Sequence, residues 1–173
     1  MSVKSNKKEI TQIANLMKSS ANVREIKKLL KEYSKTGFNF NSKYYQGKTL
    51  IYLSIEYDYI NLIKILVKYG CNPNICDDRF ISPLHLAVMK QNVSAVKQLL
   101  KCSVDINIPG EFDQTPLHLA MINGNLKIAK MLINSNADIY LVDERNFSIF
   151  DYAKDEKDNQ IIKYLEKKFK KGD

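Results

Sequence analysis

The sequence predicts an all-α solenoid in which short helix–turn–helix units stack side by side. Three observations support this prediction. A six-residue segment recurs after 33 residues, an interval typical of a solenoid whose repeat is one small helical unit. Both copies open with serine or threonine followed by proline, residues that favour the first turn of a helix. Apolar residues then recur at spacings of three and four, as on one face of a helix.

The repeat is clearest in the middle of the chain. Residues 82–87 (SPLHLA) recur 33 places later as residues 115–120 (TPLHLA). The same step backward gives residues 49–54 (TLIYLS), and the same step forward gives residues 148–153 (SIFDYA). Pairs of aliphatic residues keep this register further along each unit: Leu66-Val67, Leu99-Leu100 and Leu132-Ile133. Four segments in one register predict four stacked units.

The first 43 residues are predicted to form a helical N-terminal cap. Ile10, Ile13 and Leu16 indicate one helix, and Asn22 with Glu25 three residues later indicates the start of a second. Compared with the later units, this segment carries about four extra residues, which we place between Lys35 and Gly47.

Within each later unit, the residue types match the local structure predicted at their positions. Ser82 and Thr115 stand where a helix needs an N-cap, and proline follows where its missing N–H is harmless. A short apolar first helix follows, and then a second helix with one apolar face. A left-handed residue is expected after that second helix. The residues at this place are Gly70, Ser103 and Asn136.

The period and the TPLH core resemble the ankyrin repeat, a unit of a β-turn and two helices. The resemblance implies repeats at residues 44–76, 77–109, 110–142 and 143–173, with projecting β-turn loops and the last repeat serving as a C-terminal cap. The outer repeats depart from the pattern, because Tyr52 and Asp151 stand where the histidine belongs. The turn glycine of the family is kept only at Gly47, and its equivalents are Phe80, Asp113 and Asn146.

Composition narrows the class of protein. A chain of 173 residues with 45% hydrophobic and 27% charged residues is typical of one globular domain. It has no apolar run of ~18 residues that would cross a membrane, and no apolar stretch follows the basic start as in a secretory signal. Three cysteines without CxxC spacing indicate reduced thiols. We therefore expect a monomer in the cytoplasm or nucleus, or in the host-cell cytoplasm if the source is a virus or an intracellular bacterium.

The net charge of +8 comes from the beginning of the chain. Residues 1–50 hold eleven Lys or Arg and three acidic residues, whereas residues 51–150 hold nine and ten. This excess has two interpretations: a solvated capping face, or a basic adaptor that binds nucleic acid or anionic membrane. Lysine greatly outnumbers arginine and no aromatic residues alternate with the lysines, so recognition of nucleic-acid bases is not expected and nucleic acid is not the expected partner.

The candidate catalytic residues are few. His85 and His118, the only histidines, could act as a base or metal ligand, but the resemblance implies that each bonds the neighbouring loop. The acidic pairs Asp77-Asp78 and Asp143-Glu144 could form a carboxylate site, although such loop charges are usually solvated. The sequence contains no nucleophile with a base, no glycine-rich phosphate loop and no metal-ligand spacing. We predict a protein that is not an enzyme and uses no cofactor or metal.

The predicted function is protein binding. In the ankyrin family, partners contact the loop tips and the outward side of the first helix, which line a concave groove. Solvent-facing loops rarely need apolar side chains. Apolar residues at the loop tips and on the first helices, with tyrosine and arginine nearby, therefore have the composition of an interface hot spot. The predicted partner-binding residues are Tyr45, Tyr57, Arg79, Ile81, Met89, Phe112, Ile122, Arg145 and Phe147. A regulatory inhibitor, or a host-directed viral or bacterial factor, would fit this description.

Overall fold

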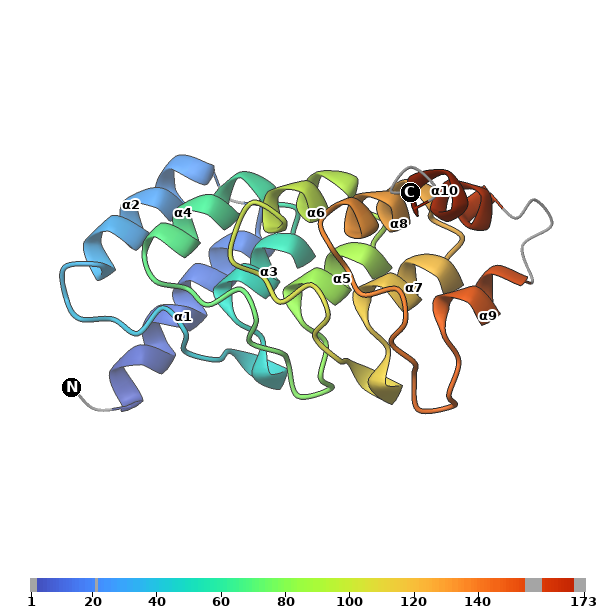
Figure 1. The fold of residues 1–173 in the computed structure, drawn as a ribbon. Helices are drawn as coiled ribbons and strands as arrows, with labels where there is room; N and C mark the ends of the chain where they lie inside the picture. The colour runs from blue at the N-terminus through green and yellow to red at the C-terminus, as the bar shows by residue number, and fades with distance from the viewer. Residues whose placement is uncertain (1–2, 21, 155–159, 170–173) are drawn as a thin grey trace.

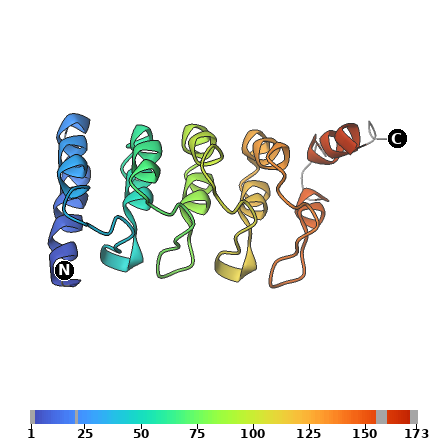
Figure 2. The same cartoon turned by 60° about the vertical axis from the view of Figure 1, so that its left-hand side comes forward.

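The computed structural model describes residues 3–20, 22–154 and 160–169, and these ranges are mostly helical. Helix pairs stand side by side in chain order, with the two ends of the chain at opposite ends of the row (Figure 2). The first helices of the pairs form one layer, the second helices form another, and loops project beyond the first helices (Figure 1). The prediction of an all-α solenoid is confirmed. Residues 155–159 and 170–173 of the predicted fourth repeat lie outside the described ranges.

The helices follow the predicted order. The first helices are α1 (Val3–Lys18), α3 (Leu50–Glu56), α5 (Pro83–Met89), α7 (Pro116–Ile122) and α9 (Ile149–Lys154). The second helices are α2 (Val23–Tyr33), α4 (Ile63–Lys68), α6 (Val93–Leu99), α8 (Leu126–Asn134) and α10 (Gln160–Phe169). Short 3₁₀ turns occur at η1 (Tyr45–Gly47), η2 (Ile60–Leu62) and η3 (Glu111–Asp113). No helix in the described ranges is both long enough and apolar enough to cross a membrane.

The predicted helix starts are confirmed. The side chains of Ser82 and Thr115 accept hydrogen bonds from the backbone N–H of His85 and His118, and proline follows at the first helical position. Thr49 caps α3 in the same way without a proline. These side chains satisfy N–H groups that would otherwise lack partners at the helix start.

The core is continuous along the stack because each pair buries its apolar face against the next. Leu84, Ala87 and Val88 of α5 are buried, and α5 lies between α3 and α7. Burial extends from Ile10 in the first pair to Leu165 in α10, so no repeat has a separate core.

Asparagine side chains link each repeat to the next behind the helices. The Oδ1 atom of Asn41 accepts the backbone N–H of Asn72 at 2.6 Å, Asn74 accepts that of Asp105 at 2.8 Å, and Asn107 accepts that of Asp138 at 2.9 Å. We call this series the asparagine ladder. The next position in the register is Tyr140, which has no such oxygen.

Two sequence predictions are revised. Gly70 and Asn136 have the expected left-handed backbone, with φ of 88° and 67°, but Ser103 does not. Helix α6 ends early at Leu99, and residues 100–102 form a turn, so a left-handed residue is not needed at Ser103. The extra residues of the N-terminal segment lie before Gly37, in a longer second helix and its turn, because the ladder is already in register at Asn41.

Candidate binding surface at the loop tips

Hairpin loops project from the solenoid beyond the first helices (Figure 1). We name them fingers 1 to 4: residues 44–48, 77–81, 110–114 and 143–147. In each finger the N–H of the first residue donates to the carbonyl oxygen of the fifth, with N···O distances of 2.7 to 3.0 Å. The fingers therefore have the same closure and present their tips along one edge of the stack.

An aspartate organises every second finger. Asp77 opens finger 2, and one of its carboxylate oxygens accepts the N–H groups of Arg79 and Ile81, both at 2.9 Å. Asp143 opens finger 4 and accepts those of Arg145 and Phe147 at 3.0 and 2.9 Å. Burial alone would raise the pKa of Asp143, but hydrogen bonds from the Tyr152 hydroxyl, these N–H groups and Gln114 lower it to about 2. Asp143 is therefore an anion that holds the turn.

Fingers 1 and 3 begin with Tyr44 and Gly110 and lack this aspartate. Each instead has two successive left-handed residues, Gln46 and Gly47 in finger 1 and Phe112 and Asp113 in finger 3. Fingers 2 and 4 have one each. The fingers thus alternate between two ways of making the same turn.

Left-handed backbone occurs at all four turn positions, although only one is glycine. Phe80, Asp113 and Asn146 have φ of 61°, 55° and 61°, close to the 73° of Gly47. A residue with a Cβ atom pays roughly 1–2 kcal/mol in this conformation. Phenylalanine has neither the small size of glycine nor the local hydrogen bonds of asparagine, so Phe80 and Phe112 are strained residues.

The fingers hydrogen-bond in pairs. The N–H of Asp78 donates to the carbonyl oxygen of Gln46 at 3.1 Å, which joins fingers 1 and 2, and the N–H of Glu144 donates to that of Phe112 at 3.0 Å, which joins fingers 3 and 4. The equivalent bond between Glu111 and Arg79 does not occur in the described chain. A cleft of about 530 Å³ lies there. Its lining includes Arg79, Phe80, Glu111, Phe112 and Asp113.

A second hollow, of about 500 Å³, lies between fingers 3 and 4 and the first helices behind them. Phe112 and Glu144 line both hollows, and this one is also lined by Gln114, Ile122, Arg145 and Tyr152. Arg145 is held in place because its guanidinium donates to the Tyr152 hydroxyl at 2.6 Å and lies 5.2 Å over the Phe147 ring. The hollow therefore combines apolar side chains with an oriented cation.

The surface around the cleft is rich in carboxylates. Asp78, Glu111, Asp113 and Glu144 are exposed there. The two arginines each lie near a buried aspartate of their own finger, with N···O distances of 3.7 Å. The arrangement suits a ligand with basic groups around an apolar centre. No group of three or more His, Cys, Asp or Glu side chains that could hold a metal ion is found among the residues the structure describes.

Comparison with known proteins agrees with this architecture. The family described as ankyrin repeats (3 copies) matches residues 58–143 and 84–172, which together cover more than half of the chain. The chain belongs to the ankyrin-repeat family. Among curated proteins, a putative ankyrin repeat protein of fowlpox virus (strain NVSL) is 36% identical over 56 residues. These residues are 32% of this chain and 8% of that relative, so the chain spans only a small part of its length.

The histidines of these ankyrin repeats connect each first helix to the loop of the next repeat, as predicted. The Nε2 atom of His85 donates to the carbonyl oxygen of Gln114 at 2.9 Å, and that of His118 to Leu141 at 3.1 Å. The Nδ1 atom of each accepts the N–H of the N-cap residue. Burial lowers the pKa of His85 to about 4, and that of His118 also falls. Both rings are therefore neutral at pH 7.

Tyr52 occupies the histidine position in the first repeat, and it is buried close to the Asp77 carboxylate of finger 2. Burial, with the Asp77 carboxylate adding to it, raises the pKa of Tyr52 to about 12. Gly110 is fitted to the next connection, because a Cβ atom there would lie 2.9 Å from Nε2 of His85. Sequence reasoning gave neither Tyr52 nor Gly110 a role.

The structure brings most of the predicted binding residues to one surface. Tyr45, Met89, Phe112, Ile122 and Phe147 are large exposed apolar residues. Arg79 and Arg145 are exposed too, and Tyr57 is half-buried against the core. The prediction for Ile81 is wrong. Its side chain is 5% exposed, whereas Phe147, at the equivalent position of finger 4, is 44% exposed.

Three exposed apolar residues were not predicted. Phe80, at the tip of finger 2, is 69% exposed and lines the cleft. Tyr140 and Val142 are exposed just before finger 4. Phe80 occupies the turn-glycine position of the family. A bulky residue at a position that favours glycine is the sequence signal that indicates a functional side chain here.

Proposed function

We propose that this chain is a non-enzymatic module that binds a partner protein through the surface formed by its fingers and first helices. The binding centre would be the cleft between fingers 2 and 3 together with the hollow between fingers 3 and 4. Ankyrin repeats are generally protein-binding modules, and the chain belongs to that family. The proposal adds the location and chemistry of the site.

One observation carries the proposal. Phe80 and Phe112 keep exposed aromatic rings on left-handed backbone, at finger tips that close without any help from those rings. Folding gains nothing from this arrangement, since glycine would relieve the strain and a polar residue would be better solvated. Strain of this kind is typical of ligand-binding sites. Aromatic residues at the centre of an interface also supply much of the binding energy.

The partner segment would carry an apolar anchor flanked by lysine or arginine. The apolar anchor would enter between Phe80 and Phe112, and the basic groups would face the exposed carboxylates of the cleft. Opposite charges across an interface accelerate association and select the partner. The affinity would thus come from the phenylalanines and the specificity from the carboxylates.

Capture of partners from an extract, followed by titration, tests the site. Combining Phe80→Ala with Phe112→Ala, which both line the cleft, should weaken binding by roughly 2 kcal/mol or more for each central anchor. Both side chains are exposed, so the free energy of unfolding should change by only about 0.5 kcal/mol. Tyr140→Ala is the matched control, because Tyr140 is exposed but lines neither hollow.

A partner that is lost by the double variant and retained by Tyr140→Ala supports the proposed site. A partner that binds the double variant as tightly as the wild type contradicts it. The roles of regulatory inhibitor and of host-directed factor stay predictions, as does the cytoplasmic or nuclear location. The viral origin of the fowlpox relative supports the host-directed role.

A further inference from the structure

Lysine recurs with the repeat period on the second helices. Lys64, Lys97, Lys130 and Lys163 are spaced by 33 residues, one each on α4, α6, α8 and α10. Four residues later, Lys68, Lys101 and Lys167 form a second row, in which Lys101 lies in the turn after α6 and Asn134 takes the place on α8. Lys27 and Lys31 on α2 extend both rows, shifted by the four extra residues of the first helix pair. We call these nine lysines the lysine stripe.

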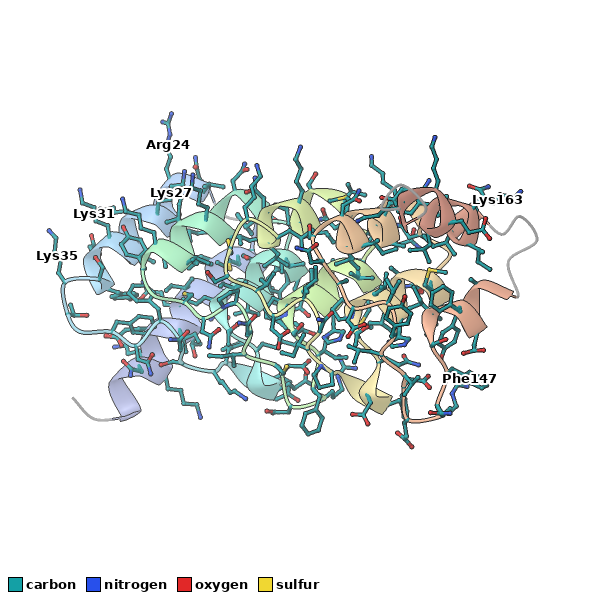
Figure 3. All side chains as sticks on the ribbon, in the orientation of Figure 1. Arg24, Lys27, Lys31, Lys35, Phe147 and Lys163 are labelled. Carbon is teal, nitrogen blue, oxygen red and sulfur yellow. The ribbon has the colours of Figure 1, made fainter. Side chains whose placement is uncertain are left out.

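The stripe occupies the side of the molecule opposite the fingers. Arg24, Lys27, Lys31 and Lys163 extend from the second-helix edge, whereas Phe147 lies at the finger edge (Figure 3). Eight of the nine lysines are exposed, and Lys130 is half-buried over the Tyr164 ring. Helices α4, α6 and α8 contain no acidic residue. None of the salt bridges among the described residues involves the stripe.

Charge is thus separated across the solenoid. Residues 51–150 hold nine basic and ten acidic residues, which nearly cancel when counted along the chain. In the fold, six of these ten acidic residues lie in the fingers, whereas five of the nine basic residues lie on the second helices. The finger side and the second-helix side therefore present opposite charges to a partner.

We propose that the lysine stripe is a second binding surface, independent of the fingers, for the phosphate backbone of double-stranded nucleic acid. Residues four apart on a helix are about 6 Å apart along its axis, and packed helices lie about 10 Å apart. The stripe is therefore about 40 Å long and only two lysines wide. A duplex, whose charge runs along a line, matches this shape and spans that length with about 12 base pairs.

The composition of this face argues against other partners. Protein interfaces are depleted in lysine and enriched in aromatic residues, the reverse of what the stripe offers. Peripheral membrane binding usually adds inserted apolar side chains to basic ones. None of the large exposed apolar residues of the described chain lies on a second helix. Lysine binds phosphate as a point charge, so this surface would hold the backbone without reading bases, which agrees with the sequence expectation against base recognition.

Binding of a fluorescent duplex of about 20 base pairs, long enough to cover the stripe, tests the inference. DNA and RNA duplexes are titrated separately by anisotropy at several salt concentrations, because either could supply the phosphates. Lys64→Glu with Lys97→Glu should weaken binding at least about tenfold and reduce the salt slope by about 2, since each phosphate contact contributes about 0.9. Lys43→Glu with Lys90→Glu is the control, which removes the same four charges from the formal +8 at exposed sites off the stripe.

Loss of binding in the stripe variant, with the control variant within about threefold of the wild type, supports the inference. Equal loss in both variants would show that only net charge matters and would overturn it. The same conclusion follows if the wild type binds neither duplex, or binds vesicles containing phosphatidylserine in preference to both. Phe80→Ala with Phe112→Ala should leave duplex binding unchanged, which keeps this test separate from that of the fingers.

Discussion

His85 shows how one buried side chain makes stability depend on pH. Its ring donates to Gln114 through Nε2 and accepts from Ser82 through Nδ1, and only the neutral form does both. A protonated ring would place an N–H against the N–H of Ser82. This agrees with a pKa of about 4 in the folded chain against 6.5 in a solvated histidine.

The free energy of unfolding should therefore fall as pH falls from about 6.5 to about 4, because the unfolded chain binds a proton there and the folded chain does not. The slope due to His85 should approach ~1.4 kcal/mol per pH unit. Urea unfolding at a series of pH values measures it. His85→Gln should lower stability by about 1–3 kcal/mol at pH 7 and reduce this slope. A variant that keeps the full slope would contradict the assignment. The stability that Asp143 contributes is lost only at lower pH, between about pH 4 and pH 2.

Single residues were predicted well where the reason is local. The caps at Ser82 and Thr115 depend on atoms three residues away, and the histidines occur at a position that the repeat fixes. Ile81 was misplaced because the finger itself does not decide burial at its fifth position: Ile81 is buried, whereas Phe147, whose N–H is bound in the same way, is exposed. Gly110 was missed because its neighbour in space, His85, lies in another repeat.

Among the elements, the fingers show how different sequences make equivalent turns. Fingers 2 and 4 begin with an aspartate and have one left-handed residue, whereas fingers 1 and 3 have no such aspartate and two left-handed residues. In finger 2 the aspartate carboxylate accepts two N–H groups of its own turn, and these hydrogen bonds replace the second left-handed residue. Helices could be predicted from periodicity, which sums over many residues. The conformation of the finger tips could not be predicted in this way, because only four or five residues determine each turn.

Asp77→Ala should open finger 2 and lower the free energy of unfolding by roughly 2 kcal/mol or more, because it leaves the N–H groups of Arg79 and Ile81 without their acceptor. Hydrogen exchange at the Ile81 amide should become faster. Asp78→Ala is the control, since the Asp78 side chain is exposed and only its backbone N–H bonds finger 1. Similar exchange at Ile81 in both variants would show that Asp77 does not hold the turn.

For the whole molecule, stability in a solenoid is approximately a sum of repeat terms and contacts between neighbours. The asparagine ladder is one such contact. Asn74 accepts the N–H of Asp105 and donates to the carbonyl oxygen of Ser103, so it connects two successive inter-repeat loops. The sequence predicted the stack and its period, but it did not reveal the ladder, whose partners are 31 residues apart.

Asn74→Ala should lower the free energy of unfolding by about 1–2 kcal/mol and broaden the transition, because repeats on either side become less coupled. Urea unfolding followed by circular dichroism measures both the midpoint and the steepness. Asn61→Ala, at an exposed site in η2, should change neither. Identical curves for the two variants would mean that the ladder does not couple the repeats.

The ladder also has a direction, since each acceptor belongs to one repeat and each donor to the next. A duplicated copy of residues 77–109, inserted after residue 109, would find a partner on both sides, whereas Tyr140 offers a following unit no acceptor. Evolution can therefore lengthen this protein from within. Each internal duplication would add one finger to one face and two lysines to the other. The reach of the two faces would then grow together, in steps of one repeat.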